Sequence, residues 1–189
     1  MDLTPTPSQT AGPYFHLGCT QLHSVQRIAG SQAKGLHLRL ICRVLDGDGR
    51  PVPDAMVEIW QADADGKYNH AEDSRAGSAD PHCAGFGRMP TDEQGACQFE
   101  TIQPGCVPAA NGMQAPHLSV SVFARGILKR LATRIYFEND PANAACPVLS
   151  LVPAERRGTL LATQHSVHAE VWHFDIRLCG EQETVFFDV

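Results

Sequence analysis

A chain of 189 residues is long enough for one domain with a real core, and its 43% hydrophobic and 19% charged residues are typical of a globular protein. The formal net charge of -6, from 15 Lys and Arg against 21 Asp and Glu, disfavours nucleic acid as a partner. No stretch approaches the roughly 18 apolar residues of a membrane span, so no membrane partner is expected either.

The N-terminal residues and the cysteines indicate the compartment. Prolines stand at positions 5, 7 and 13, where a signal peptide needs an apolar run. The chain has 7 cysteines, an odd number, and no two of them form a CxxC pair. This pattern suits neither a disulfide framework nor a zinc knuckle. We therefore expect reduced thiols in a cytoplasmic protein.

The first 35 residues show neither strand nor helix periodicity. A proline-rich terminus of that length is either disordered or packed on a neighbour. We predict that residues 1–35 form an extended arm that packs on a partner chain. Residues 36–189 are predicted to form the folded domain, in which apolar and polar residues alternate with the period of a half-buried strand. We expect strands over 36–46, 56–62, 96–102, 117–125, 131–137 and 170–178, with a short one over 183–189.

Helical periodicity is weak and limited to one or two turns near 139–146 and 154–161. Short strands separated by Gly, Pro and Asp turns are typical of sandwiches and barrels. The predicted fold class is therefore all-β, an antiparallel β-sandwich with little helix.

No complete catalytic motif stands out from spacing alone. The sequence lacks a GxSxG elbow, an HExxH helix and a phosphate-binding glycine loop. The 9 histidines form no closed ligand set, since Ser119 follows His117 at the strand spacing where a second ligand is expected. Arg125, at the end of a strand, is either a solvated strand end or a group that binds an acid.

Several segments in order resemble one family, the intradiol ring-cleaving dioxygenases. The resemblance runs from about Thr6 to the C-terminus, and that family's fold is an antiparallel β-sandwich. The segments that carry it are SQTAGPYF (8–15), IWQADADGKY (59–68), TIQPG (101–105), APH (115–117), FARG (123–126) and FDIRLCGEQETVFFDV (174–189).

The resemblance implies a position for a ferric ion held by two tyrosines and two histidines. Tyr68 and His117 stand at two of these positions, whereas Val107 and Ser119 stand at the other two. Gln114 replaces an Arg that usually precedes the first histidine by three residues. Ferric ions prefer anionic oxygen donors, so we expect no metal on this chain and interpret Tyr68 and His117 as remnants.

Within the family, the similarity is to alpha chains that act with an iron-bearing beta chain. It implies a non-metal-binding alpha subunit in a multi-copy alpha/beta oligomer, with Fe(III) on the beta chain and a small aromatic acid and O2 as substrates. No catalytic residue is expected on this chain, and the isolated chain is expected to be inactive. The residues implied to wall the substrate pocket are Thr10, Gly12, Pro13, Tyr14 and Arg125.

Two other hypotheses remain open from the sequence. In the first, the chain is a structural scaffold that has lost its site and takes no part in substrate binding. In the second, it carries its own iron, bound by Tyr68 and His117 with a loop histidine such as His70 or His82. Iron content and activity of the chain alone discriminate between them.

Overall fold

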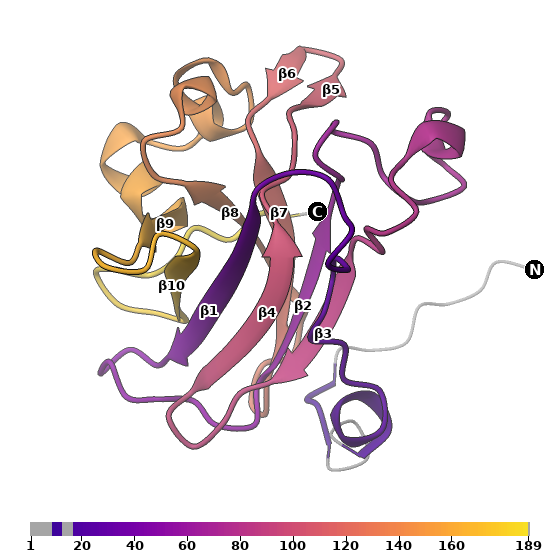
Figure 1. The fold of residues 1–189 in the computed structure, drawn as a ribbon. Coiled ribbons are helices and arrows are strands. Elements are labelled where there is room, and N and C mark those ends of the chain that lie inside the picture. Colours follow the sequence, from indigo (N-terminus) through magenta and orange to yellow (C-terminus); the bar gives the residue numbers. More distant parts are fainter. Residues whose placement is uncertain (1–8, 13–16, 189) are drawn as a thin grey trace, which may run out of the picture.

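A computed structural model describes residues 9–12 and 17–188 and shows a β-sandwich (Figure 1). The all-β prediction is confirmed. Helical structure within these residues is limited to short segments of 3–7 residues, and none of it is long and apolar enough to cross a membrane.

The described elements follow the predicted pattern of short strands and turns. The strands are β1 (His37–Leu45), β2 (Met56–Gln61), β3 (Phe86–Pro90), β4 (Ala96–Ile102), β5 (Val107–Ala109), β6 (Gly112–Gln114), β7 (His117–Phe123), β8 (Leu131–Phe137), β9 (Leu161–Gln164) and β10 (Val171–Arg177). The helical turns are η1 (Leu17–Gln21), η2 (Ala76–Ser78), η3 (Pro141–Ala145), η4 (Leu149–Leu151) and η5 (Ala154–Leu160).

The prediction of a strand over 183–189 is wrong, and several strands of the structure were not predicted. In the segment 183–189 the described residues form no strand, and Phe187 makes only an isolated bridge to Ala132. The strand β3 was missed because its sequence FGRMP contains Gly and Pro and does not alternate. Its Gly87 is required by packing, since a Cβ there would lie 2.7 Å from the Cγ1 atom of Ile28.

The sheet has eight strands in the order β3-β2-β7-β8-β9-β10-β1-β4, and a separate hairpin is formed by β5 and β6. Pairing is antiparallel except for β1 with β10 and β8 with β9, which are parallel. Residues from both halves of this sheet form one buried core, so the halves pack face to face.

Part of the expected arm closes the sandwich between β3 and β4. The Val25 amide donates to the carbonyl of Arg88 on β3 at 2.7 Å, and the Ile28 amide donates to the carbonyl of Glu100 on β4 at 2.8 Å. Ile28 is 1% exposed and belongs to the main core. The segment 25–29 therefore packs on its own domain, and packing on a partner chain stays a prediction for the residues before it.

The central strand β7 positions the site. Leu118, Val120 and Val122 are buried in the core, so the alternate residues His117 and Ser119 lie on the outer face of the sheet. The β5–β6 hairpin and the loop that carries η2 lie at the same end of the sandwich (Figure 1).

Replacing the core residue of the closing segment, Ile28→Ala, should lower the free energy of unfolding by about 2–5 kcal/mol, because the side chain leaves a cavity between β3 and β4. Urea denaturation measures this. The matched control is Leu22→Ala, at a side chain that is 79% exposed and where we expect about 0.5 kcal/mol or less. Equal losses for the two variants would contradict the closing role of this segment.

Candidate functional site

The register of three neighbouring strands places three side chains in one row. Trp60 on β2 lies opposite Ser119 on β7, and Ser119 lies opposite Arg134 on β8. Cross-strand partners on one face have Cβ atoms about 4.5–5.5 Å apart. The next row pairs His117 with Tyr136, whose ring centroids are 5.8 Å apart. These rows form the floor of the candidate site.

Tyr68 enters from the loop after β2 and packs on this floor. Its ring stacks on that of Trp60, with centroids 5.9 Å apart and an interplanar angle of 3°. Its amide donates to Oδ2 of Asp73 at 3.0 Å, and Asp73 also accepts two hydrogen bonds from the guanidinium of Arg75. Burial raises the pKa of the Tyr68 phenol, and the positive charge of Arg134 opposes part of that rise.

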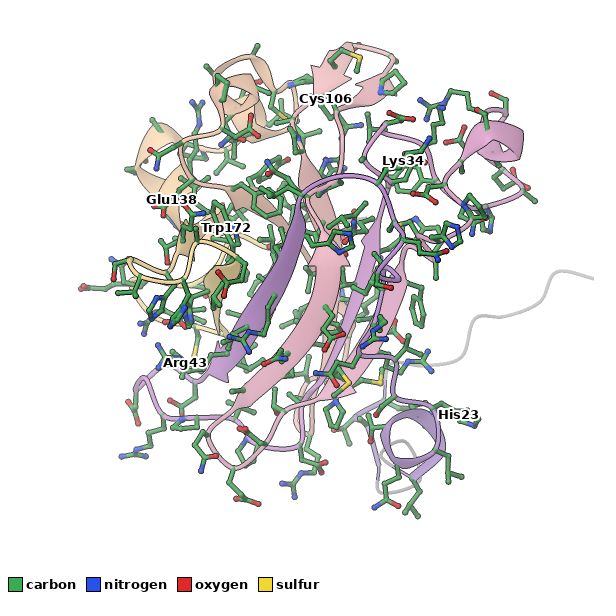
Figure 2. All side chains as sticks on the ribbon, viewed as in Figure 1. His23, Lys34, Arg43, Cys106, Glu138 and Trp172 are labelled. Atoms are coloured by element: carbon green, nitrogen blue, oxygen red, sulfur yellow. The ribbon has the colours of Figure 1, made fainter. Side chains whose placement is uncertain are left out.

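A tight turn holds Tyr68 beside the start of β5. The buried carboxylate of Asp63 accepts hydrogen bonds from the amides of Asp65 and Lys67, both at 2.9 Å. Gly66 has a φ of +75°, and a Cβ there would lie 1.9 Å from the carbonyl oxygen of Cys106. Cys106 lies beside the β5–β6 hairpin (Figure 2) and directly precedes Val107. This close approach therefore fixes the loop of Tyr68 against the strand of Val107.

His117 is buried in a neutral form. The side chain is 3% exposed, and its Nδ1–H donates to the carbonyl of Ala115 at 2.8 Å. Burial, and to a smaller extent the charge of Arg134, lowers the pKa of His117 to about 4.

Arg134 connects the sheet to the hairpin. One guanidinium nitrogen donates to Oε1 of Gln114 on β6, and it lies 3.5 Å from the hydroxyl of Tyr136. Gln114 is the residue that pairs with Val107 across the hairpin. Burial raises the pKa of Tyr136 to about 12, so this phenol stays protonated at neutral pH.

The structure therefore brings together the residues that the sequence predicts as ligand positions. Tyr68 and Val107 line an open pocket of about 520 Å³ together with Trp60. Trp60 lies opposite Ser119 on β7, and His117 lies two residues before Ser119 on the same face of that strand. The residues lining that pocket are Trp60, Tyr68, His70, Glu72, Asp73, Ser74, Arg75, Val107 and Pro108.

The donors present here do not fit a ferric ion. One phenol and one imidazole remain, whereas Val107 offers no donor atom and Ser119 offers only a neutral hydroxyl. Loop histidines do not complete a set: the His70 ring packs edge-on against Trp60 at 6.0 Å, and its Nδ1 accepts from the amide of Glu72. No three His, Cys, Asp or Glu side chains among residues 9–12 and 17–188 are grouped to hold a metal ion.

Three of the residues predicted to wall a substrate pocket, Thr10, Gly12 and Arg125, lie at the opposite end of β7. The span from His117 to Arg125 corresponds to roughly 26 Å of extended strand. The hydroxyl of Thr10 accepts a hydrogen bond from the amide of Gly126 at 2.8 Å, and Thr10 and Gly12 line a small groove beside the β7–β8 turn. Arg125 is exposed in the same turn. Pro13 and Tyr14 lie outside the described residues.

Sequence reasoning missed Trp60, Arg134 and Tyr136. Arg134 and Tyr136 could have been found from the alternation in LATRIYF, which places both on one face of the strand. Pairing of 131–137 with 117–125 then brings that face beside His117. The register itself is not readable from the pattern, because the β7–β8 turn can close in more than one way.

Comparisons with known proteins support the resemblance to a dioxygenase family. A dioxygenase family profile matches residues 10–180. The chain is 44% identical to the protocatechuate 3,4-dioxygenase alpha chain of Burkholderia cepacia, over 99% of this chain and 98% of that protein. It is 36% identical to the beta chain from the same organism, over 86% of this chain and 73% of that protein. The dioxygenase domain of a carbohydrate-binding fusion from Streptomyces sp. SirexAA-E has a TM-score of 0.64 at 26% identity, covering 94% of this chain and 99% of that one.

The low pKa of His117 predicts a loss of stability in mild acid. A histidine in the unfolded chain titrates near 6.5, whereas folded His117 titrates near 4, so between these values the unfolded state binds the proton and is favoured. We expect this contribution to be complete above pH 6.5 and to fall by up to about 3 kcal/mol as the pH drops to 4. Urea unfolding as a function of pH measures it.

The variant His117→Gln should have a shallower decline over the same pH range, and His173→Gln, at a half-buried histidine on β10, serves as the control that keeps it. Parallel stability curves for the wild type and His117→Gln would contradict the assignment.

Proposed function

The chain belongs to the intradiol ring-cleavage dioxygenase family, and we propose that it is the alpha subunit of a protocatechuate 3,4-dioxygenase and binds no metal itself. The observation that carries this proposal is that residues without a suitable donor atom stand at two of the four ligand positions implied by the family. Val107 and Ser119 stand at two positions where the family resemblance implies ligands, and Tyr68 and His117 stand at the other two. Near full-length similarity to alpha chains supports the choice of subunit.

In this proposal the Fe(III) belongs to a beta chain, and the chemistry takes place in the assembled alpha/beta oligomer. The reaction cleaves protocatechuate between its two hydroxylated carbons and incorporates both atoms of O2, which yields 3-carboxy-cis,cis-muconate without a reductant. The part of the alpha chain is to position the substrate and to exclude water. A cytoplasmic location stays a prediction.

The substrate-facing part of this chain is the β7–β8 turn with the arm that packs on it. Thr10 accepts from the amide of Gly126, so the arm and Arg125 lie next to each other. Pro13 and Tyr14 follow Gly12 directly in the chain, and their part in the pocket wall stays a prediction. An exposed guanidinium suits the carboxylate of an aromatic acid, since Arg binds carboxylates with charge-assisted hydrogen bonds.

Exposed apolar residues near η1 support a partner. Leu17 is 46% exposed and Leu22 is 79% exposed in the isolated chain. Both lie in the part of the predicted arm that precedes the closing segment 25–29. Burial of these side chains against a beta chain would remove apolar surface from water and favour assembly.

Expression of the chain alone and together with a beta chain tests the proposed function. We expect the chain alone to contain less than about a tenth of an iron per chain and to show no turnover, because a phenol and an imidazole bind Fe(III) weakly. Co-expression should yield an active complex that contains iron. Stoichiometric iron with dioxygenase activity in the chain alone would contradict the proposal.

The role of the pocket wall is tested separately in the co-expressed enzyme. Arg125→Ala should raise the KM for protocatechuate by about 10-fold to 100-fold and leave the iron content unchanged, since it removes a charge-assisted hydrogen bond. Arg50→Ala, at an exposed arginine in the β1–β2 turn, is the matched control and should change neither quantity. An unchanged KM for Arg125→Ala would favour the structural-scaffold hypothesis instead.

A further inference from the structure

We propose that the guanidinium of Arg134 takes the place of a metal cation in this chain: it holds the remnant cluster together and keeps a metal ion out. The remnant cluster is defined as Tyr68, Val107, Gln114, His117 and Ser119. This inference rests on the proposed function. It names Arg134 as a residue that prevents this chain from binding a metal ion.

The backbone places Arg134 between both lost ligand positions. It lies directly opposite Ser119 on the neighbouring strand, with both side chains on the outer face of the sheet. The small Ser119 side chain leaves room for a long neighbour in that row. From there the guanidinium reaches Gln114, which pairs with Val107 across the hairpin. The Arg134 side chain thus runs from the row of Ser119 to the strand of the hairpin that pairs with Val107.

The charge of Arg134 acts on both retained donors. It lowers the pKa of His117 and opposes the rise in the pKa of Tyr68, so both rings lie within its electrostatic reach. A metal ion bound by these two rings would have to lie within the same reach. An Arg side chain stays protonated at every physiological pH, and like charges repel more strongly in a half-buried site than in water. The repulsion is therefore permanent.

Gln114 completes the arrangement as the acceptor of Arg134. The resemblance to the family implies an Arg at position 114, on the hairpin, and here the guanidinium comes from β8 instead. The Gln114 side chain supplies an amide oxygen that accepts from Arg134, whereas an Arg at that position would face it with a second positive charge. Gln114 and Arg134 are thus a matched pair, and the hydrogen bond between them ties the β5–β6 hairpin to the sheet.

This arrangement separates two explanations of why the chain would lack iron. If the missing donors are the whole reason, restoring them restores the site. If Arg134 is also a barrier, restoring the donors is insufficient until the positive charge is removed. The difference is measurable as metal affinity and needs no activity assay.

The experiment compares full-length chains that carry Val107→Tyr and Ser119→His, with Arg134 kept or changed to Gln. Each chain is loaded with ferric nitrilotriacetate and desalted, and its iron content and visible tyrosinate-to-iron absorption are measured. We expect the chain with Arg134→Gln to bind iron about 100-fold more tightly than the chain that keeps Arg134. The matched control adds Arg50→Gln, an equal loss of charge far from the cluster, and should behave like the chain that keeps Arg134.

Equal iron affinity with and without Arg134→Gln would overturn the inference. Iron in the unmodified chain would contradict the proposed function instead, so the two failures are distinguishable. Where a tyrosine at position 107 prevents folding, Ser119→His with and without Arg134→Gln provides the second comparison, with Co²⁺ as the probe and its visible bands as the readout. Tighter Co²⁺ binding only after Arg134→Gln supports the inference, and equal binding overturns it.

Discussion

The packing of β7 between β2 and β8 is the constraint on which the rest of the structure depends. Leu118, Val120 and Val122 are buried between the two halves of the sandwich, and this burial holds the strand in a single register. A shift by one residue would move those side chains into water and bring His117 into the core. The burial of these core side chains therefore also fixes which residues of β7 lie on its outer face.

Both regions to which a function is proposed follow from that strand. Its first residue, His117, lies in the remnant cluster, and the turn after its last residue carries Arg125. The cluster at the first end has an enclosed histidine and a guanidinium in contact with the hairpin, which suits a role within the chain. The other end presents an exposed arginine and the arm, which suits a role toward a neighbour. The two regions thus lie at opposite ends of one strand.

The retained framework around the cluster has a physical explanation that does not require a metal. Tyr68 stacks on Trp60, His117 donates to Ala115, and Gly66 allows the loop to approach the hairpin. Each of these contacts contributes to packing and hydrogen bonding whether or not a cation is bound. The architecture therefore does not need donor atoms at positions 107 and 119, provided that the polar groups around them find partners.

The sequence by itself determined the fold class and most of the strands, because alternation along one strand depends only on which face is buried: 96–102 and 131–137 coincide with β4 and β8. The resemblance to a known family, rather than spacing, assigned Tyr68, Val107, His117 and Ser119 to one candidate site. The tertiary structure alone decided that the segment 25–29 closes the sheet and that Arg134 meets Gln114. These features depend on contacts between distant segments, whose register and approach are set by packing of the whole core rather than by local pattern.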